Sequence, residues 1–132
     1  MAENTVVKEQ LTDAMIEEGA QLTSKLDETG LPVTAAFWLY VTDLNEWRLV
    51  FASPEVSSNG PRAVYEKIRR AVAELGGEGI ALSNIGVLDP DADLVRLLKF
   101  AVRTGPGVNR IRFSKNVING HFIDDALIYR AA

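Results

Sequence analysis

Two strand–turn–strand segments, one in each half of the chain, limit what this sequence can fold into more than any other feature. In the first, two runs rich in β-branched and aromatic side chains flank a short polar connection: residues 33–42 and 47–52. In the second, strand-like residues 109–118 and 122–130 flank Asn119-Gly120, the dipeptide most typical of a tight hairpin turn. Because hairpin strands are antiparallel, the pattern argues against a wholly parallel sheet.

Helical periodicity occupies three further segments, residues 5–28, 61–75 and 91–103, in which apolar side chains recur at steps of three and four. Gly19 interrupts the first apolar stripe at a helix-propensity cost of about 1 kcal/mol, which predicts that another segment packs closely there. In the third helix, Asp89 is the expected N-terminal cap. The polar side chains of this helix lie on one narrow stripe, formed by Arg96, Lys99 and Arg103. The helix is therefore expected to be widely buried or to pack against a partner.

The predicted element order is therefore α-β-β-α-β-α-β-β, with the lone strand over residues 80–88 and a flexible loop over residues 57–60. This order predicts an α+β fold: one mixed, mainly antiparallel five-stranded sheet covered by three helices. A length of 132 residues suits a single domain spanning residues 1–132, with residues 1–6 expected to be frayed. The aromatic residues of the first hairpin are expected to lie in its core.

The amino-acid composition excludes several kinds of functional site. The chain has no cysteine, which excludes disulfides, thiolate nucleophiles and cysteine-based zinc sites. The first ten residues are polar, unlike a secretory signal, and no apolar run is long enough to span a bilayer, so a cytoplasmic protein without membrane association is expected. The glycine-containing loops lead into strands, whereas phosphate-binding loops lead into helices, and no cofactor is predicted.

The spacing of Asp89, Asp91 and Asp93 invites comparison with a calcium-binding loop. Such a loop needs glycine at its sixth position and glutamate at its twelfth, and counting from Asp89 these positions hold Leu94 and Phe100. The motif fails, and acidic residues at the start of a helix account for the cluster. No metal site is predicted.

His121 is the only histidine and follows the second hairpin turn, with Asp124 and Asp125 close behind it. In a regular strand His121 and Asp125 share a face, so a carboxylate-oriented imidazole acting as a general base is one hypothesis, which would make the protein a hydrolase. The alternative is a solvent-exposed turn histidine beside solubilising acids. His121, Asp124 and Asp125 are the catalytic candidates, and whether the chain is an enzyme is left open.

The net charge of −4 is unevenly distributed. Residues 1–60 hold three basic and ten acidic residues, whereas residues 61–132 hold eleven basic and eight acidic ones. If the second helix and the fourth strand are neighbours, their cations form an anion-binding or nucleic-acid-binding face. The alternative is a set of solvated, paired side chains. The candidate residues are Arg62, Arg69, Arg70, Arg110, Arg112 and Lys115.

The leading hypothesis from the sequence is a non-enzymatic interaction or ligand-binding module that self-associates. It rests on the nearly all-apolar third helix and on the first strand, which is apolar on both faces. Homodimers are the commonest soluble assemblies, so the chain is expected to form a homo-oligomer. A different protein is the alternative partner. Binding of nucleic acid through the basic residues is the alternative.

Overall fold

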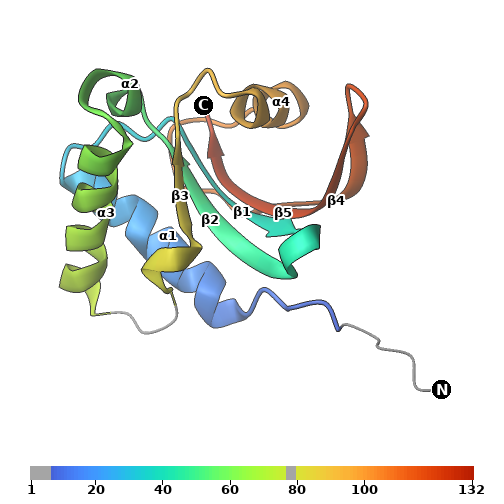
Figure 1. Cartoon of the computed structure of the whole chain (residues 1–132), viewed down its shortest axis with the longest axis horizontal. Coiled ribbons are helices and arrows are strands. Elements are labelled where there is room, and N and C mark those ends of the chain that lie inside the picture. Colours follow the sequence, from blue (N-terminus) through green and yellow to red (C-terminus); the bar gives the residue numbers. More distant parts are fainter. Residues whose placement is uncertain (1–6, 77–79) are drawn as a thin grey trace.

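The computed structural model describes residues 7–76 and 80–132 (Figure 1). The described strands are β1 (Ala35–Val41), β2 (Glu46–Ala52), β3 (Ile85–Leu88), β4 (Ile111–Ile118) and β5 (His121–Ala131). The described α-helices are α1 (Asp13–Glu28), α2 (Glu55–Asn59), α3 (Pro61–Leu75) and α4 (Asp93–Ala101). The strands form one sheet in the order β3-β2-β1-β5-β4, in which only the β2–β3 pair is parallel. The predicted fold class and element order are confirmed, with α2 as an additional short helix.

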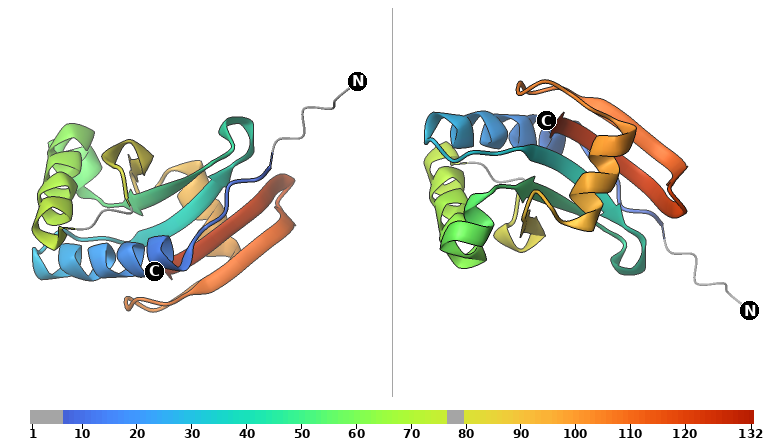
Figure 2. Two further views of the ribbon diagram at one scale, coloured as in Figure 1. Left: turned by 90° about the horizontal axis from the view of Figure 1, so that it is seen from below. Right: turned by 90° about the horizontal axis from the view of Figure 1, so that it is seen from above.

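The sheet is covered on both faces, with α1 and α3 on one side and α4 on the other (Figure 2). On β1, Ala36 and Trp38 pack in the core beneath α1 and α3, while Ala35 and Phe37 pack beneath Val95 and other residues of α4. This explains why the first strand is apolar on both faces. The expectation that its aromatic residues form core is confirmed, because both Phe37 and Trp38 are fully buried.

The close approach predicted at Gly19 is made by two aromatic side chains. Tyr129 and Trp38 lie against the Cα atom of Gly19, where a methyl group would overlap them. Trp38 Nε1 donates a hydrogen bond to the Tyr129 hydroxyl at 2.9 Å, and that hydroxyl donates to the Ile16 carbonyl at 2.6 Å. Burial raises the pKa of the Tyr129 phenol above its usual range. The glycine thus lets α1 rest directly on the sheet.

The C-terminal end of β5 is fixed by a buried arginine. Arg130 donates from Nη1 and Nη2 to the two carboxylate oxygens of Asp27, at 2.9 and 2.7 Å. It also donates to the carbonyls of Val33 and Gly107. The guanidinium is buried, and its fork geometry satisfies three separate segments at once. Arg130 therefore ties α1, the start of β1 and the loop before β4 to the last strand.

The prediction that the first helix spans residues 5–28 is wrong at its start. Helix α1 begins at Asp13, and the Thr12 hydroxyl caps it by accepting from the Met15 amide at 3.1 Å. Residues 7–11, here called the strap, carry no regular structure and cross the sheet before the helix begins. Residues 1–6, which the sequence predicts to be frayed, lie outside the described residues.

Three other predicted boundaries also differ. Residues 57–60 were expected to be a loop, but most of them belong to α2. The lone strand begins at Ile85 rather than at residue 80, because a 3-10 turn occupies Leu82–Asn84. Asp89 does not cap α4: its carboxylate accepts from the Asp91 amide and from the Ser57 hydroxyl, and α4 begins at Asp93.

Within the described part of the chain, no helix is both long and apolar enough to cross a membrane.

The two hairpins separate at one end of the sheet. Pairing between β1 and β5 ends at Leu39 and Ala126, although each strand continues beyond that point. Lys115 on β4 has left-handed backbone geometry, with a φ of 47°, and beyond it the normal alternation of faces is broken. Ile118 and Ile123 consequently pack on the α4 side together with Ala126. The sheet therefore opens into a gap between the β1–β2 and β4–β5 hairpins.

Candidate functional site

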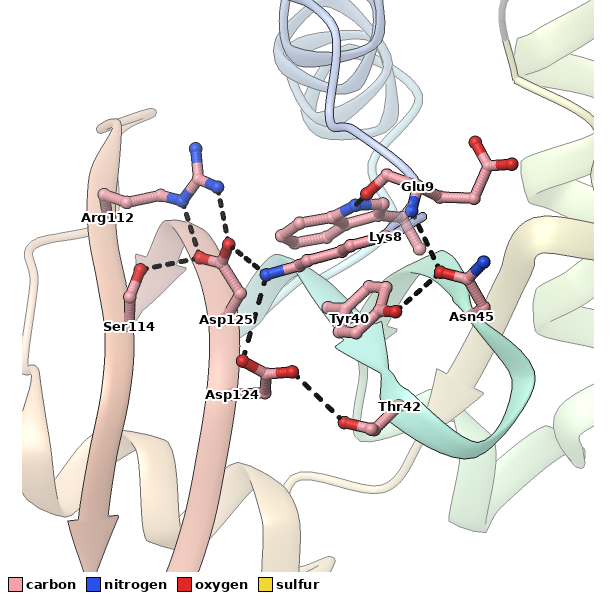
Figure 3. Close-up of polar contacts among 10 residues, drawn as sticks. Lys8, Glu9, Tyr40, Thr42, Asn45, Arg112, Ser114, Asp124 and Asp125 are labelled. Carbon is pink, nitrogen blue, oxygen red and sulfur yellow. Dashed lines mark hydrogen bonds and ion pairs between the residues drawn. The ribbon is translucent and has the colours of Figure 1, made fainter. Parts of the chain in front are cut away.

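A network of charges fastens the strap across this gap on the α1 side of the sheet (Figure 3). Asp125 on β5 is buried and accepts from Arg112 Nε and Nη2, at 2.7 Å each. It also accepts from the Ser114 hydroxyl at 2.7 Å and from Lys8 Nζ at 2.9 Å. Burial disfavours the charged carboxylate, but the hydrogen bonds from these three partners outweigh it and hold the pKa of Asp125 far below its usual range.

Aromatic rings form the floor under these cations. Lys8 Nζ lies 4.5 Å from the centre of the Tyr40 ring, and Arg112 Cζ lies 5.4 Å from the centre of the Trp47 ring. The Trp47 indole donates to the Glu9 carbonyl at 2.9 Å, so the first hairpin holds the backbone of the strap in addition to the Lys8 side chain. Two rings from the first hairpin thus support cations from the strap and from the second hairpin.

Asn45 completes the attachment of the strap. It adopts a left-handed backbone at the turn between β1 and β2, with a φ of 47°. Its side-chain amide donates to the Val7 carbonyl at 3.0 Å, and its side-chain oxygen accepts from the Glu9 amide at 2.9 Å and the Tyr40 hydroxyl at 2.6 Å. Because the donors and acceptors of this network are paired with one another, its chemical role is to fasten the strap.

On the opposite side of the sheet, the gap between the hairpins forms a groove of about 490 Å³, here called the hairpin groove. Leu39, Leu94, Leu97 and Ile123 provide apolar lining, and Phe122 lines it while remaining 62% exposed. The groove also carries three carboxylates and the only histidine of the chain: Asp43, Asp93, Asp124 and His121. It combines an apolar lining with an excess of negative charge.

Asp124 connects the hairpin groove with the strap network. Its carboxylate accepts from the Thr42 hydroxyl at 3.3 Å and lies 3.8 Å from Lys8 Nζ. Asp43 and Asp93 differ from it, because over residues 7–76 and 80–132 neither carboxylate takes part in an ion pair. Both residues are exposed, so these two charges face solvent.

The exposed side of α4 adjoins the groove. Asp93, Leu97 and Phe100 lie at positions i, i+4 and i+7 and therefore form one stripe. Phe100 is 74% exposed, and it shares a shallow depression with three cations that form no ion pair within the described residues: Arg96, Lys99 and Arg103. We call this stripe and its cations the α4 outer face. It is acidic at its start, basic toward its end and apolar between.

The broad burial predicted for α4 is only partly observed. Val95 and Leu98 are fully buried against the sheet, and Leu94 and Leu97 are half-buried. Phe100 is not covered by any described segment. The sequence pattern therefore identified an apolar side chain that the described residues leave largely exposed.

The six predicted anion-binding residues do not converge. Arg62, Arg69 and Arg70 lie on α3, which packs beside β3, whereas the other three lie just before β4 or on it: Arg110, Arg112 and Lys115. Strands β3 and β4 are opposite edges of the sheet, separated by four strand spacings or about 19 Å.

Several of these cations are also paired. Arg69 binds Glu66 at 2.7 Å and Arg110 binds Glu17 at 2.7 Å, both at the surface. The hydrogen bonds that Arg112 donates to Asp125 raise the pKa of Arg112. The grouping of cations on α4 was not among the predicted sites. Its signal was the narrow polar stripe of the third helix, which was used only to predict that the rest of this helix is buried or packs against a partner.

The shared face expected for His121 and Asp125 is not observed. His121 lines the hairpin groove on the α4 side, whereas Asp125 points to the strap on the α1 side. The hydrogen bonds of Asp125 come from Arg112, Ser114 and Lys8, and its low pKa makes it a weak base. Asp124 does line the groove together with His121.

Among residues 7–76 and 80–132, no three histidine, aspartate or glutamate side chains are grouped so that they could hold a metal ion. Comparisons of the chain with protein-family models, with curated proteins and with solved structures find no match. The function of the chain therefore has to be inferred from the geometry of the hairpin groove and the α4 outer face.

Proposed function

We propose that this chain is a non-enzymatic interaction module that binds a cationic, amphipathic segment of a protein through the hairpin groove. The observation that carries the proposal is the exposure of two large aromatic side chains beside carboxylates that form no ion pair within the described residues. Phe100 is 74% exposed and Phe122 is 62% exposed, and Asp43 and Asp93 lie on or near the same surface. Exposed aromatic residues rimmed by charge are typical of protein-interaction surfaces.

The chemistry of the groove selects the class of ligand. An apolar side chain that enters beside Leu94 and Leu97 loses its contact with water, while a neighbouring lysine or arginine is attracted by Asp43 and Asp93. A purely anionic ligand is repelled by the same carboxylates. A peptide segment that alternates apolar and basic side chains satisfies both parts of the surface.

Isothermal titration with a short leucine–lysine peptide tests this function, with the matched leucine–glutamate peptide as the control ligand. We expect the first to bind and the second not to. The double variant Asp43→Asn/Asp93→Asn should weaken binding about tenfold, because each exposed charge contributes modestly. Glu28→Gln removes an exposed carboxylate at the end of α1 and should leave affinity unchanged. Equal binding of both peptides, or of neither, contradicts the proposal.

A further inference from the structure

The surface of α4 is complementary to itself. Its first turn and the adjoining hairpin groove carry Asp93 and Asp43, which form no ion pair within the described residues. Its later turns carry Arg96 and Lys99, and Arg103 lies just beyond its last residue, Ala101. Two such helices side by side and antiparallel place the acidic end of each against the basic end of the other. A single contact is then made twice, as two-fold symmetry requires.

We infer that the segment bound in the hairpin groove is α4 of a second copy of this chain, which forms a two-fold symmetric dimer. The inference rests on the proposed function and names its ligand. With the symmetry axis beside the middle of α4, Asp93 of each copy faces Arg103 of the other. Phe100 of each copy then enters the groove beside Phe122 and Leu97 of the other.

The amount of exposed aromatic surface sets the expected affinity of the dimer. At exposures of 74% and 62%, Phe100 and Phe122 of two copies offer on the order of 500 Å² of aromatic surface. Leu97 and the aliphatic stems of the three cations add to it. Stable interfaces bury upwards of roughly 1,200 Å², so the dimer lies at the small end, with a dissociation constant on the order of 10–100 µM.

The full chain can be tested by sedimentation equilibrium from about 1 µM to about 1 mM, a range that brackets the expected constant. We expect a monomer–dimer equilibrium that weakens as salt is added. Phe100→Ser, at an exposed position that the fold does not need, should weaken dimerisation about tenfold or more. Leu75→Ser replaces an exposed leucine at the end of α3 and should leave dimerisation unchanged.

Charge reversal tests the symmetry itself. Asp93→Lys alone places like charges together at both contacts, and so does Arg103→Glu alone, so each variant should be monomeric. An equimolar mixture should associate, because the two reversed ends attract each other and the two unaltered ends do the same. Reversal variants that dimerise alone, or whose mixture stays monomeric while the unaltered chain dimerises, overturn this arrangement.

The remaining outcomes separate this inference from the proposed function. A chain that stays monomeric up to about 1 mM overturns the dimer. Binding of the leucine–lysine peptide by that monomer would leave the proposed function standing, whereas its absence would remove both. Growth into assemblies larger than a dimer also overturns the two-fold arrangement, because a closed symmetric contact cannot propagate.

Discussion

Replacement of Gly19 by alanine separates the local preference of α1 from the demands of its packing. Helix propensity alone predicts that Gly19→Ala stabilises the fold by about 1 kcal/mol. The structure predicts the opposite, because a Cβ atom at this position would lie 2.7 Å from Trp38 Nε1 and 2.9 Å from Tyr129 Cε2. Neither is the end of a flexible surface side chain, since both residues are fully buried.

The magnitude depends on which groups must move. Overpacking of a core costs about 1–3 kcal/mol, and displacing the Tyr129 hydroxyl endangers its bonds with Trp38 and Ile16, at about 1 kcal/mol each. After subtracting the propensity gain, we expect Gly19→Ala to lower the free energy of unfolding by about 3 kcal/mol. For a chain of this size that corresponds to a fall in Tm of about 10 °C.

Urea denaturation followed by circular dichroism measures this change. Ser24→Ala is the matched control on the exposed side of α1, and it should gain about 0.5 kcal/mol from propensity alone. In a Tyr129→Phe background both hydroxyl bonds are already absent, so Gly19→Ala should cost about 2 kcal/mol less than in the unaltered chain. Stabilisation by Gly19→Ala would refute the close packing of α1 on Trp38 and Tyr129.

Three further predictions concern the polar anchors. Asp125→Asn should lower the free energy of unfolding by about 2–4 kcal/mol at neutral pH. The folded state lowers the pKa of Asp125, so its stabilising effect is complete above the pKa of an unfolded aspartate, near 4, and is lost as the pH falls below that value. Plots of the free energy of unfolding against pH should therefore converge in acid for the variant and the unaltered chain. Arg130→Met should lower the free energy of unfolding, measured by urea denaturation, by about 3 kcal/mol, because it leaves two carbonyls and Asp27 without their hydrogen-bond donor. A loss below about 1 kcal/mol would contradict that role. Lys8→Met, measured in a Trp38→Phe background, should change the fluorescence of Trp47 while costing less than about 1 kcal/mol; an unchanged spectrum would show that Lys8 does not hold the strap.

The sheet and its helices were predictable because their signals are local. Apolar spacing located α3 with both boundaries correct, and Asn119-Gly120 located the β4–β5 turn. The start of α1 was missed for the opposite reason. Lys8 binds Asp125, which lies 117 positions away, and no local pattern encodes a contact over that separation. Without it, the polar residues of the strap resemble the first turns of a helix.

The candidate site was predictable only in part. The narrow polar stripe of α4 was visible in the sequence, and so was its excess of apolar residues. The hairpin groove was not, because it depends on where pairing between β1 and β5 stops and on the left-handed residue Lys115. The same distortion separates His121 from Asp125, so a pairing inferred from regular strand alternation could not hold. Sheet order likewise divided the predicted basic face between two edges.

Disulfide trapping tests most directly whether α4 meets its own copy. The chain contains no cysteine, so Leu97→Cys introduces a single thiol at the centre of the α4 outer face, and Ser24→Cys introduces one on the exposed side of α1. Under mild oxidation at concentrations near the expected dissociation constant, Leu97→Cys should form a covalent dimer much faster than Ser24→Cys. Equal rates for the two variants, or faster trapping through position 24, would contradict an interface built on α4.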